Sequence, residues 1–288
     1  MRIVLDVGAN TGQNLRYFLD TTDKVIAIEA DETLCKRIQE EFESEIVENR
    51  LKVLNFALVR HDSLEHKRGF VSFYSPKSVE RSVLGSLVKP QRLQDFHLKE
   101  VPSSSIIEIV NDHVDKSDVI SYCKVDIEGY DQVILEDLFK NGIYPEVLSF
   151  ECHSLTPINL VFESKFYNSF KVVEGASVGR SLKVIQNQKS LEQTEDAKSY
   201  EFSVHSSGPW GGDIPGPWLS RFGVSLYLFL TGPGWKDVHV SRVPKRNRKL
   251  FPLIYQKLAF KYMLKRLRNK LRLRTRVKDI LRVMLRRA

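Results

Sequence analysis

One short segment combines a carboxylate with a glycine-rich turn, and this combination is suited to holding a polar ligand. It reads VLDVGANTG over residues 4–12, with Asp6 before the turn and Gly8 and Gly12 within it. Glycines let the backbone turn tightly and let a ligand approach it closely. A second carboxylate, Glu29, ends the run KVIAIE, where an acid can accept the hydroxyls of a ribose. These residues predict a site for an adenosine-containing cofactor.

Three cofactor chemistries compete for this turn, and its spacing discriminates between them. A phosphate-binding loop requires GxxxxGK[ST], and a dinucleotide fingerprint requires GxGxxG, whereas three residues separate the glycines here. Asp6 would repel a pyrophosphate and attract a cation. S-adenosylmethionine (SAM) carries an adenosine, an ammonium and a sulfonium, and no phosphate, so it fits best. A turn with a purely structural role is the alternative.

A second group of polar residues follows two later strands. Asp126 and Glu128 lie in KVDIEG, and Glu151 and His153 end LSFECH. Ligands of open α/β sheets bind at the carboxyl ends of the strands, where these residues are expected. His153 is a candidate general base, because imidazole titrates near neutral pH. A Lys124–Asp126 ion pair and a merely hydrogen-bonded histidine are the structural alternatives. Asp126, Glu151 and His153 could hold a divalent cation, but their spacing does not require one, and we predict no metal.

The elements that must position these residues alternate between strand and helix. Strands are expected at 2–7, 24–29, 51–59, 69–74, 122–126 and 146–152, and helices at 14–20, 32–42, 104–113 and 130–141. Segments 170–174 and 201–205 are expected to finish the sheet as a hairpin-like pair, and residues 75–102 to form loop with short helices. This order predicts a parallel, doubly wound α/β sheet.

The composition is that of a globular domain. The chain has 288 residues, of which 42% are hydrophobic and 28% charged, which argues against disorder. No apolar run approaches the roughly 18 residues of a membrane span. Three cysteines are too few for a disulfide framework and favour reduced thiols in the cytoplasm.

Residues 245–288 differ from the rest of the chain in charge. They hold 17 of the 44 Lys and Arg residues and one acid, so this basic tail carries +16 and the remainder −8. Its apolar residues recur at spacings of three and four, which predicts an amphipathic helix or helix pair. Such a helix could lie on an anionic membrane surface, bind RNA, or fold against the acidic body. We favour the membrane surface, because residues 1–244 contain no recognisable RNA-binding module.

Four blocks of the sequence resemble the FkbM family of SAM-dependent methyltransferases: VLDVGANTG (4–12), AIEAD (27–31), YCKVDIEGYDQVIL (122–135) and LSFECH (148–153). The resemblance implies a class I methyltransferase domain over residues 1–244, with a doubly wound, mostly parallel, seven-stranded Rossmann-like sheet, and the basic tail as a helical extension. It further implies methylation of a hydroxyl on a saccharide, glycolipid or secondary metabolite. Many relatives carry elements before the first strand, so a more open pocket or an upstream start is expected.

On this interpretation the candidate residues form two sets. The cofactor set lies on the glycine turn and at the ends of the second and third strands: Asp6, Gly8, Asn10, Gly12, Glu29, Ala30, Asn55 and Ala57. The catalytic candidates are Asp126, Glu128 and His153. In SGPWGGDIPGPW (207–218), Trp210 and Trp218 could stack on a sugar ring, with a rigid structural turn as the alternative.

Other functions stay open at this stage. An RNA methyltransferase would use the basic tail for phosphate contacts, and a non-catalytic binding protein would have kept the fold alone. The glycine spacing disfavours an NAD-dependent dehydrogenase, and no Asp/Asn-Pro-Pro-Tyr segment of nucleobase N-methyltransferases occurs. We expect a small-molecule or saccharide acceptor and a cytoplasmic protein, with peripheral attachment to the inner membrane face as a further expectation.

Overall fold

The computed structural model describes residues 1–78, 84–175, 183–186, 198–202 and 206–243, together with Gln256, Lys257 and Phe260. Nearly all of the basic tail lies outside these residues, so its predicted helix stays a prediction. Among the described helices, none has the length and apolar character needed to cross a membrane.

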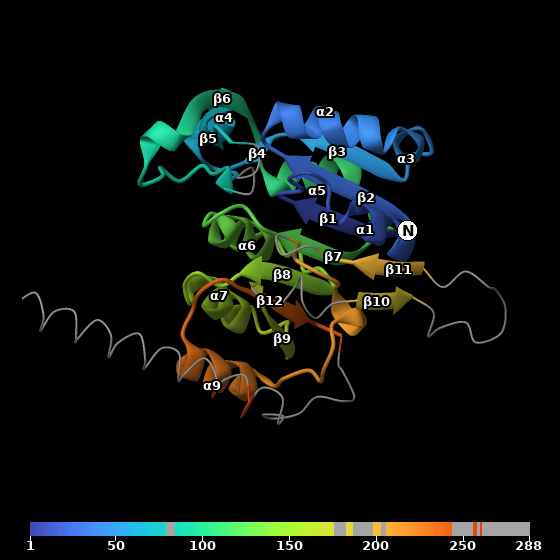
Figure 1. The fold of residues 1–288 in the computed structure, drawn as a ribbon, viewed down its shortest axis with the longest axis vertical. Helices are drawn as coiled ribbons and strands as arrows, with labels where there is room; N and C mark the ends of the chain where they lie inside the picture. Colours follow the sequence, from blue (N-terminus) through green and yellow to red (C-terminus); the bar gives the residue numbers. More distant parts are fainter. Residues whose placement is uncertain are drawn as a thin grey trace, which may run out of the picture.

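A seven-stranded sheet forms the centre of the fold (Figure 1), in the order β3-β2-β1-β7-β8-β12-β9. Its strands are β1 (Arg2–Val7), β2 (Lys24–Glu29), β3 (Leu51–Asn55), β7 (Val119–Val125), β8 (Val147–Glu151), β9 (Ser169–Glu174) and β12 (Lys236–Ser241). The first five in spatial order pair in parallel, whereas β12 runs antiparallel to both β8 and β9. This confirms the predicted doubly wound, mostly parallel sheet.

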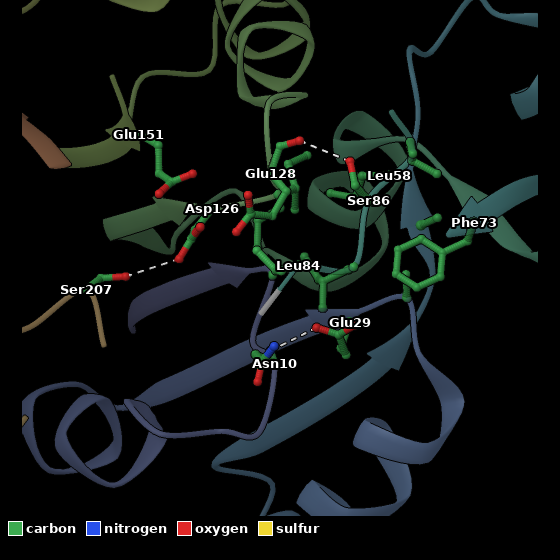
Figure 2. A pocket seen from close by; sticks show the side chains of 18 of the residues that line it. Asn10, Glu29, Leu58, Phe73, Leu84, Ser86, Asp126, Glu128, Glu151 and Ser207 are labelled. Atoms are coloured by element: carbon green, nitrogen blue, oxygen red, sulfur yellow. Dashed lines mark hydrogen bonds between the residues drawn. The ribbon is translucent and has the colours of Figure 1, made fainter. Parts of the chain in front are cut away.

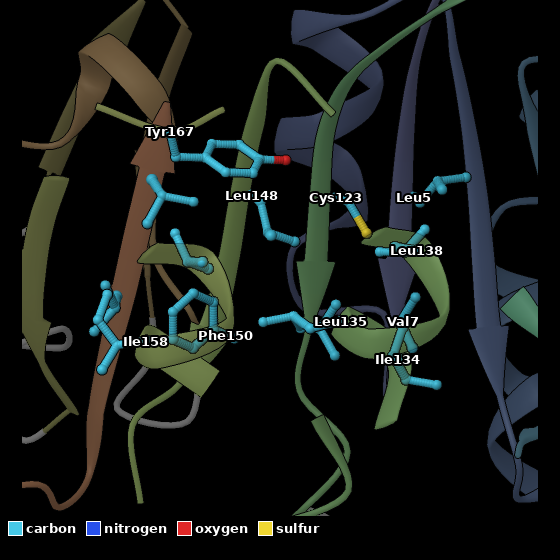
Figure 3. Packing of buried hydrophobic residues seen from close by; sticks show 14 of the residues in the cluster. Leu5, Val7, Cys123, Ile134, Leu135, Leu138, Leu148, Phe150, Ile158 and Tyr167 are labelled. Atoms are coloured by element: carbon cyan, nitrogen blue, oxygen red, sulfur yellow. The ribbon is translucent and has the colours of Figure 1, made fainter. Parts of the chain in front are cut away.

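Helices cover both faces of the sheet: α1 (Leu15–Thr21), α2 (Glu32–Glu41), α3 (Glu43–Val47), α5 (Ile106–His113), α6 (Asp131–Lys140), α7 (Thr156–Ser164) and α9 (Arg221–Thr231). A further helix, α4 (Leu64–Arg68), lies against β5 and β6. In β1, Ile3, Leu5 and Val7 belong to the core that also contains residues of α5, α6, α7 and α9, while Val4 belongs to the core that contains residues of α1 and α2. Figure 3 shows the first of these cores. Strands buried on both faces have nearly continuous apolar sequences, and for this reason RIVLDV could be predicted as a strand.

A smaller sheet corrects the expectation for residues 75–102. Strand β6 (Phe96–Ser104), preceded by the short helix η2 (Leu93–Asp95), pairs antiparallel with β5 (Phe70–Pro76) and parallel with β4 (Ala57–Leu58). The first half of β6 is largely exposed, so its sequence lacks the alternation that marks a half-buried strand.

The expected hairpin of 170–174 with 201–205 is wrong. Strand β9 pairs instead with β12, and Glu201 ends β11 (Lys198–Glu201), which pairs with β10 (Lys183–Gln186) in a separate sheet. Residues 203–205 lie outside the described chain. Strand β12 reads KDVHVS and is buried throughout, and its polar composition hides it from hydrophobic patterning.

Candidate functional site

A cavity of about 360 Å³ lies at the carboxyl ends of β1, β2, β7 and β8. The strand order reverses between β1 and β7, and open α/β sheets bind their ligands at such a switch point. The predicted residues that line it are Gly8, Asn10, Glu29, Ala30, Ala57, Asp126, Glu128 and His153. The fold therefore brings together at one cavity most of the residues selected from the sequence, whose individual roles stay predictions.

The glycine turn is held tightly against the loop that follows β7. Gly8 has φ +82°, and a Cβ at this position would lie 1.9 Å from the backbone oxygen of Asp126. The backbone nitrogen of Asp126 in turn donates to the carbonyl of Val7 at 3.0 Å. Gly12 lies outside the cavity lining, where its Cβ position faces Leu15 and Ile38 at 3.1 and 3.2 Å. Gly8 thus shapes the cavity, and Gly12 packs the turn onto the helices.

Glu29 connects the glycine turn to the end of β2. Its carboxylate accepts hydrogen bonds from the backbone nitrogens of Asn10 (2.8 Å, Figure 2) and Asp31 (2.9 Å). Burial raises the pKa of Glu29, and these backbone donors oppose the shift. Each carboxylate oxygen has two acceptor sites, so capacity for further donors is left beside the cavity. The amide of Asn55 donates to the carbonyls of Glu29 and Ala30, both at 3.0 Å. Asn55 does not line the cavity, and these bonds fix the end of β2.

Asp6 lies beneath the cavity and does not line it. Its side chain is 1% exposed and forms an ion pair with Lys124, whose Nζ lies 3.2 Å from Asp6 and 3.3 Å from Asp126. The same Nζ donates to the carbonyl of Gly8 at 2.9 Å. Although burial acts to lower it, the two carboxylates raise the pKa of Lys124 above its ordinary value. The structural alternative for Lys124 and Asp126, an ion pair, is therefore present.

One wall of the cavity is apolar. It is built from residues at the ends of β2 and β3, from the smaller sheet and from the segment that begins at Leu84: Ile28, Phe56, Ala57, Leu58, Phe73 and Leu84. Figure 2 shows Phe73 and Leu84 near Glu29, and Leu58 beside Ser86. An apolar wall next to a buried carboxylate suits a base with its attached ribose.

The opposite side of the cavity is acidic. A nitrogen of His153 lies 2.8 Å from Glu151, and this hydrogen bond raises the pKa of His153 to about 9. Burial, with Glu151 and Asp126 nearby, raises the pKa of Glu128 to about 8. Glu128 has φ +49°, and its carbonyl accepts a hydrogen bond from Ser86 at 3.0 Å. Figure 2 shows the side chains of Asp126, Glu128 and Glu151 on the same side of the cavity, with the carboxylate of Asp126 turned toward Ser207.

The segment 206–218 contributes serines to the cavity, and its tryptophans pack elsewhere. Ser206 and Ser207 line the cavity. Trp210 stacks on Tyr122 with centroids 4.9 Å apart, and Trp218 is 5% exposed with the ammonium of Lys171 4.9 Å from its ring centroid. The expectation that Trp210 and Trp218 stack on a sugar is wrong for this cavity, because neither tryptophan lines it.

Among the cavity residues not selected from the sequence, an aromatic and an acidic one lie at the start of the same strand. Trp235 and Asp237 flank the start of β12 and line the cavity. Trp235 is 45% exposed, and its ring lies over Gly175, where a Cβ would come within 2.5 Å of it. Asp237 stands directly opposite Glu151 in the pairing of β12 with β8. The signal that could have located them was the turn TGPG before this strand.

The fold is a Rossmann-like α/β sheet with a cavity at its switch point. The sequence model of the family described as the methyltransferase FkbM domain matches residues 6–178. The chain therefore belongs to the FkbM family of SAM-dependent methyltransferases, and the resemblance seen in the four sequence blocks is confirmed. No curated protein sequence matches it significantly.

Several solved structures are similar in part. Methyltransferase FkbM from Methylobacillus flagellatus KT is 14% identical over 60% of this chain and 40% of its own, with a TM-score of 0.38. A tRNA (m1A58) methyltransferase from Aquifex aeolicus is 12% identical over 85% of this chain and 63% of its own, with a TM-score of 0.35. A SAM-dependent O-methyltransferase from Thermotoga maritima is 8% identical over 85% of this chain and 60% of its own, also with a TM-score of 0.35. The chain spans less than two thirds of each of these proteins, and the family membership rests on the sequence match.

Proposed function

We propose that this protein transfers a methyl group from SAM to a hydroxyl of a saccharide, glycolipid or secondary metabolite. One observation carries the cofactor half of this proposal. The carboxylate of Glu29 is fixed by two backbone donors at the edge of a cavity, next to an apolar wall and the tight turn at Gly8. This arrangement fits a ribose and a base approached closely by backbone.

The residues of the chain bind and align the reactants. Glu29 would accept the ribose hydroxyls, the wall containing Phe56 and Leu58 would hold the base, and Gly8 leaves room where a side chain would intrude. SAM supplies a methyl group on a sulfonium, which needs no further activation. Alignment of the acceptor hydroxyl and removal of its proton are then the main tasks of the protein.

The acidic side of the cavity is the proposed acceptor side. Asp126, Glu128 and His153 are the candidate groups for receiving the hydroxyl proton or orienting the acceptor. Since the hydrogen bond to Glu151 raises the pKa of His153 to about 9, its imidazole is protonated near neutral pH and would orient the acceptor. Carboxylates accept hydrogen bonds from hydroxyls, and the partly exposed ring of Trp235 offers a flat surface beside them. Carboxylates together with an aromatic ring favour a polyhydroxylated acceptor over a phosphate-rich one, which the same carboxylates would repel.

Replacing Glu29 with alanine is expected to weaken SAM binding about 10- to 100-fold, since hydrogen bonds to a charged group contribute about 1.5–3 kcal/mol each. Titration calorimetry of the wild-type protein and Glu29→Ala with SAM measures this loss. Glu40→Ala removes an exposed glutamate of α2 and should bind SAM as the wild-type protein does.

Two outcomes would contradict the proposal. NAD binding as tight as SAM binding would remove the cofactor assignment, as would unchanged SAM affinity in Glu29→Ala.

Methyl-labelled SAM then reports on the acceptor. Label is expected in a saccharide or lipid-linked fraction, and label recovered only in RNA would contradict the hydroxyl acceptor.

For the basic tail, residues 245–288, we propose attachment to an anionic membrane surface. Each Lys or Arg near such a surface contributes about 1 kcal/mol, so a chain ending at residue 244 is expected to lose at least tenfold in affinity for phosphatidylserine-containing liposomes. Sedimentation with liposomes, with neutral liposomes as the control, measures it. Equal binding by the shortened chain would refute the attachment, and salt-sensitive RNA binding lost with the tail would favour RNA instead.

A further inference from the structure

Three potential metal ligands converge on the acidic side of the cavity. One ligand atom each from Glu128, Glu151 and His153 lies within 4.8 Å of the other two. Metal bonds to oxygen and nitrogen are about 2.0–2.2 Å long, so three ligand atoms around one ion lie about 3.0–3.6 Å from one another. Closing the cluster around an ion therefore requires side-chain shifts of up to about 1 Å.

A fourth carboxylate points to a cation at the same place. Asp237 pairs with Glu151 across the antiparallel strands β12 and β8, and residues directly opposite each other have neighbouring side chains. Asp237 is 9% exposed, lines the same cavity, and has neither a hydrogen bond nor an ion pair to its carboxylate among the described residues. Like charges directly opposite are destabilising, so this group of carboxylates favours further positive charge beyond that of His153, whose nitrogen lies 2.8 Å from Glu151.

The buried lysines nearby do not supply that charge. Lys124 is shared by Asp6 and Asp126 at 3.2 and 3.3 Å. Lys236, next to Asp237 in the chain, forms an ion pair with Glu174 at 3.3 Å. Among the described residues, His153 is therefore the basic side chain next to the carboxylates of Glu128, Glu151 and Asp237.

We propose that Glu128, Glu151 and His153 bind a divalent transition-metal ion, with Asp237 as a further ligand or as the acceptor for an ion-bound water. A mixed set of carboxylates and one imidazole suits Mn²⁺, Fe²⁺ or Zn²⁺ better than Mg²⁺ or Ca²⁺, which prefer oxygen ligands alone. The sequence-based expectation of no metal is revised, because it considered Asp126 in place of Glu128 and did not include Asp237.

The ion would have a chemical use at this place. A bound cation lowers the pKa of a coordinated hydroxyl or water, so an acceptor hydroxyl at the acidic side of the cavity would lose its proton more readily. This use rests on the proposed hydroxyl methylation, whereas binding of the ion does not. Metal binding and SAM binding can therefore be measured separately on the same protein.

The test is titration calorimetry of the full-length, metal-free protein with MnCl₂ and with ZnCl₂. One site per chain is expected, with at least tenfold weaker binding in Glu128→Gln, Asp237→Asn and His153→Gln. Glu100→Gln, which neutralises an exposed glutamate of β6, is the matched control and should bind as the wild-type protein does. The ion should also raise the melting temperature of the wild-type protein and of this control, with little effect on the three cluster variants.

Two results would overturn the proposal. In the first, the wild-type protein binds neither ion; in the second, the cluster variants bind as tightly as the control. His153 has 45% of its side chain exposed, so its substitution leaves a folded protein even if a buried variant fails to fold. A SAM titration of the metal-free wild-type protein reports on the cofactor site independently. If the protein binds SAM but no metal ion, the metal site is refuted and the cofactor proposal stands. If it binds a metal ion but no SAM, the cofactor proposal is refuted and the metal site stands.

Discussion

Gly8→Ala is expected to abolish measurable SAM binding and to lower the stability of the fold. The added Cβ would lie 1.9 Å from the carbonyl oxygen and 2.9 Å from the carbonyl carbon of Asp126. Both atoms belong to backbone, so no side-chain rotation relieves the clash. The left-handed conformation adds about 1–2 kcal/mol for any residue with a Cβ. The turn must therefore move away from the loop after β7, which opens the switch point where the cavity lies.

Gly142→Ala provides the matched control for this effect. Gly142 also has a positive φ, +73°, but no atom lies within 4 Å of its Cβ position, so its replacement tests backbone conformation without the clash. We expect a modest loss of stability and unchanged SAM affinity there. Calorimetry with SAM and thermal unfolding of both variants separate the two contributions. If Gly8→Ala bound SAM as Gly142→Ala does, the close approach at Gly8 would have no role in forming the site.

The side of the cavity that contains Glu29 could be predicted because its residues are local in sequence. Gly8, Asn10 and Glu29 lie within two consecutive strand-to-helix connections of a strongly apolar βαβ pattern, and such strand ends meet at one sheet edge. For Lys124 and Asp126, at the end of β7, an ion pair was the structural alternative to a functional role, and the structure contains that ion pair. The sequence pattern could not show which of the two carboxylates, Asp6 or Glu29, is buried below the cavity and which lines it. Asp6 faces inward to Lys124, whereas Glu29 reaches the cavity.

The acidic side of the cavity could not be predicted to the same extent, because it depends on pairings that are distant in sequence. Strand β12 inserts between β8 and β9 and brings Trp235 and Asp237 to the cavity. Its own sequence contains lysine, aspartate, histidine and serine, so neither apolar content nor alternation marks it as a buried strand. Trp210 was misassigned for a related reason. Its partner, Tyr122, comes from β7, and no local pattern reveals that contact.

Lys124→Met is expected to destabilise the protein by about 3–5 kcal/mol, the usual cost of removing one partner of a buried ion pair. Lys124 is fully buried and contacts Asp6, Asp126 and the carbonyl of Gly8. Methionine fills a similar volume but leaves the carboxylate of Asp6, 1% exposed, without its cation. Urea unfolding measures the loss. Lys140→Met, which removes an exposed lysine 3.8 Å from Glu136, should change stability by less than about 1 kcal/mol.

The double variant Asp6→Asn/Lys124→Met separates structural support from cofactor binding. Neutralising both partners removes the unpaired buried charge, so the double variant should recover part of the stability lost in Lys124→Met. Asp6→Asn alone then distinguishes two roles for this carboxylate. If Asp6 acts only through Lys124, stability falls and SAM affinity per folded molecule is kept. If Asp6 holds the amine of SAM, as the sequence suggested, SAM affinity falls at concentrations of urea where the variant is still folded. If the double variant were no more stable than Lys124→Met, the ammonium of Lys124 would stabilise the turn chiefly through the carbonyl of Gly8.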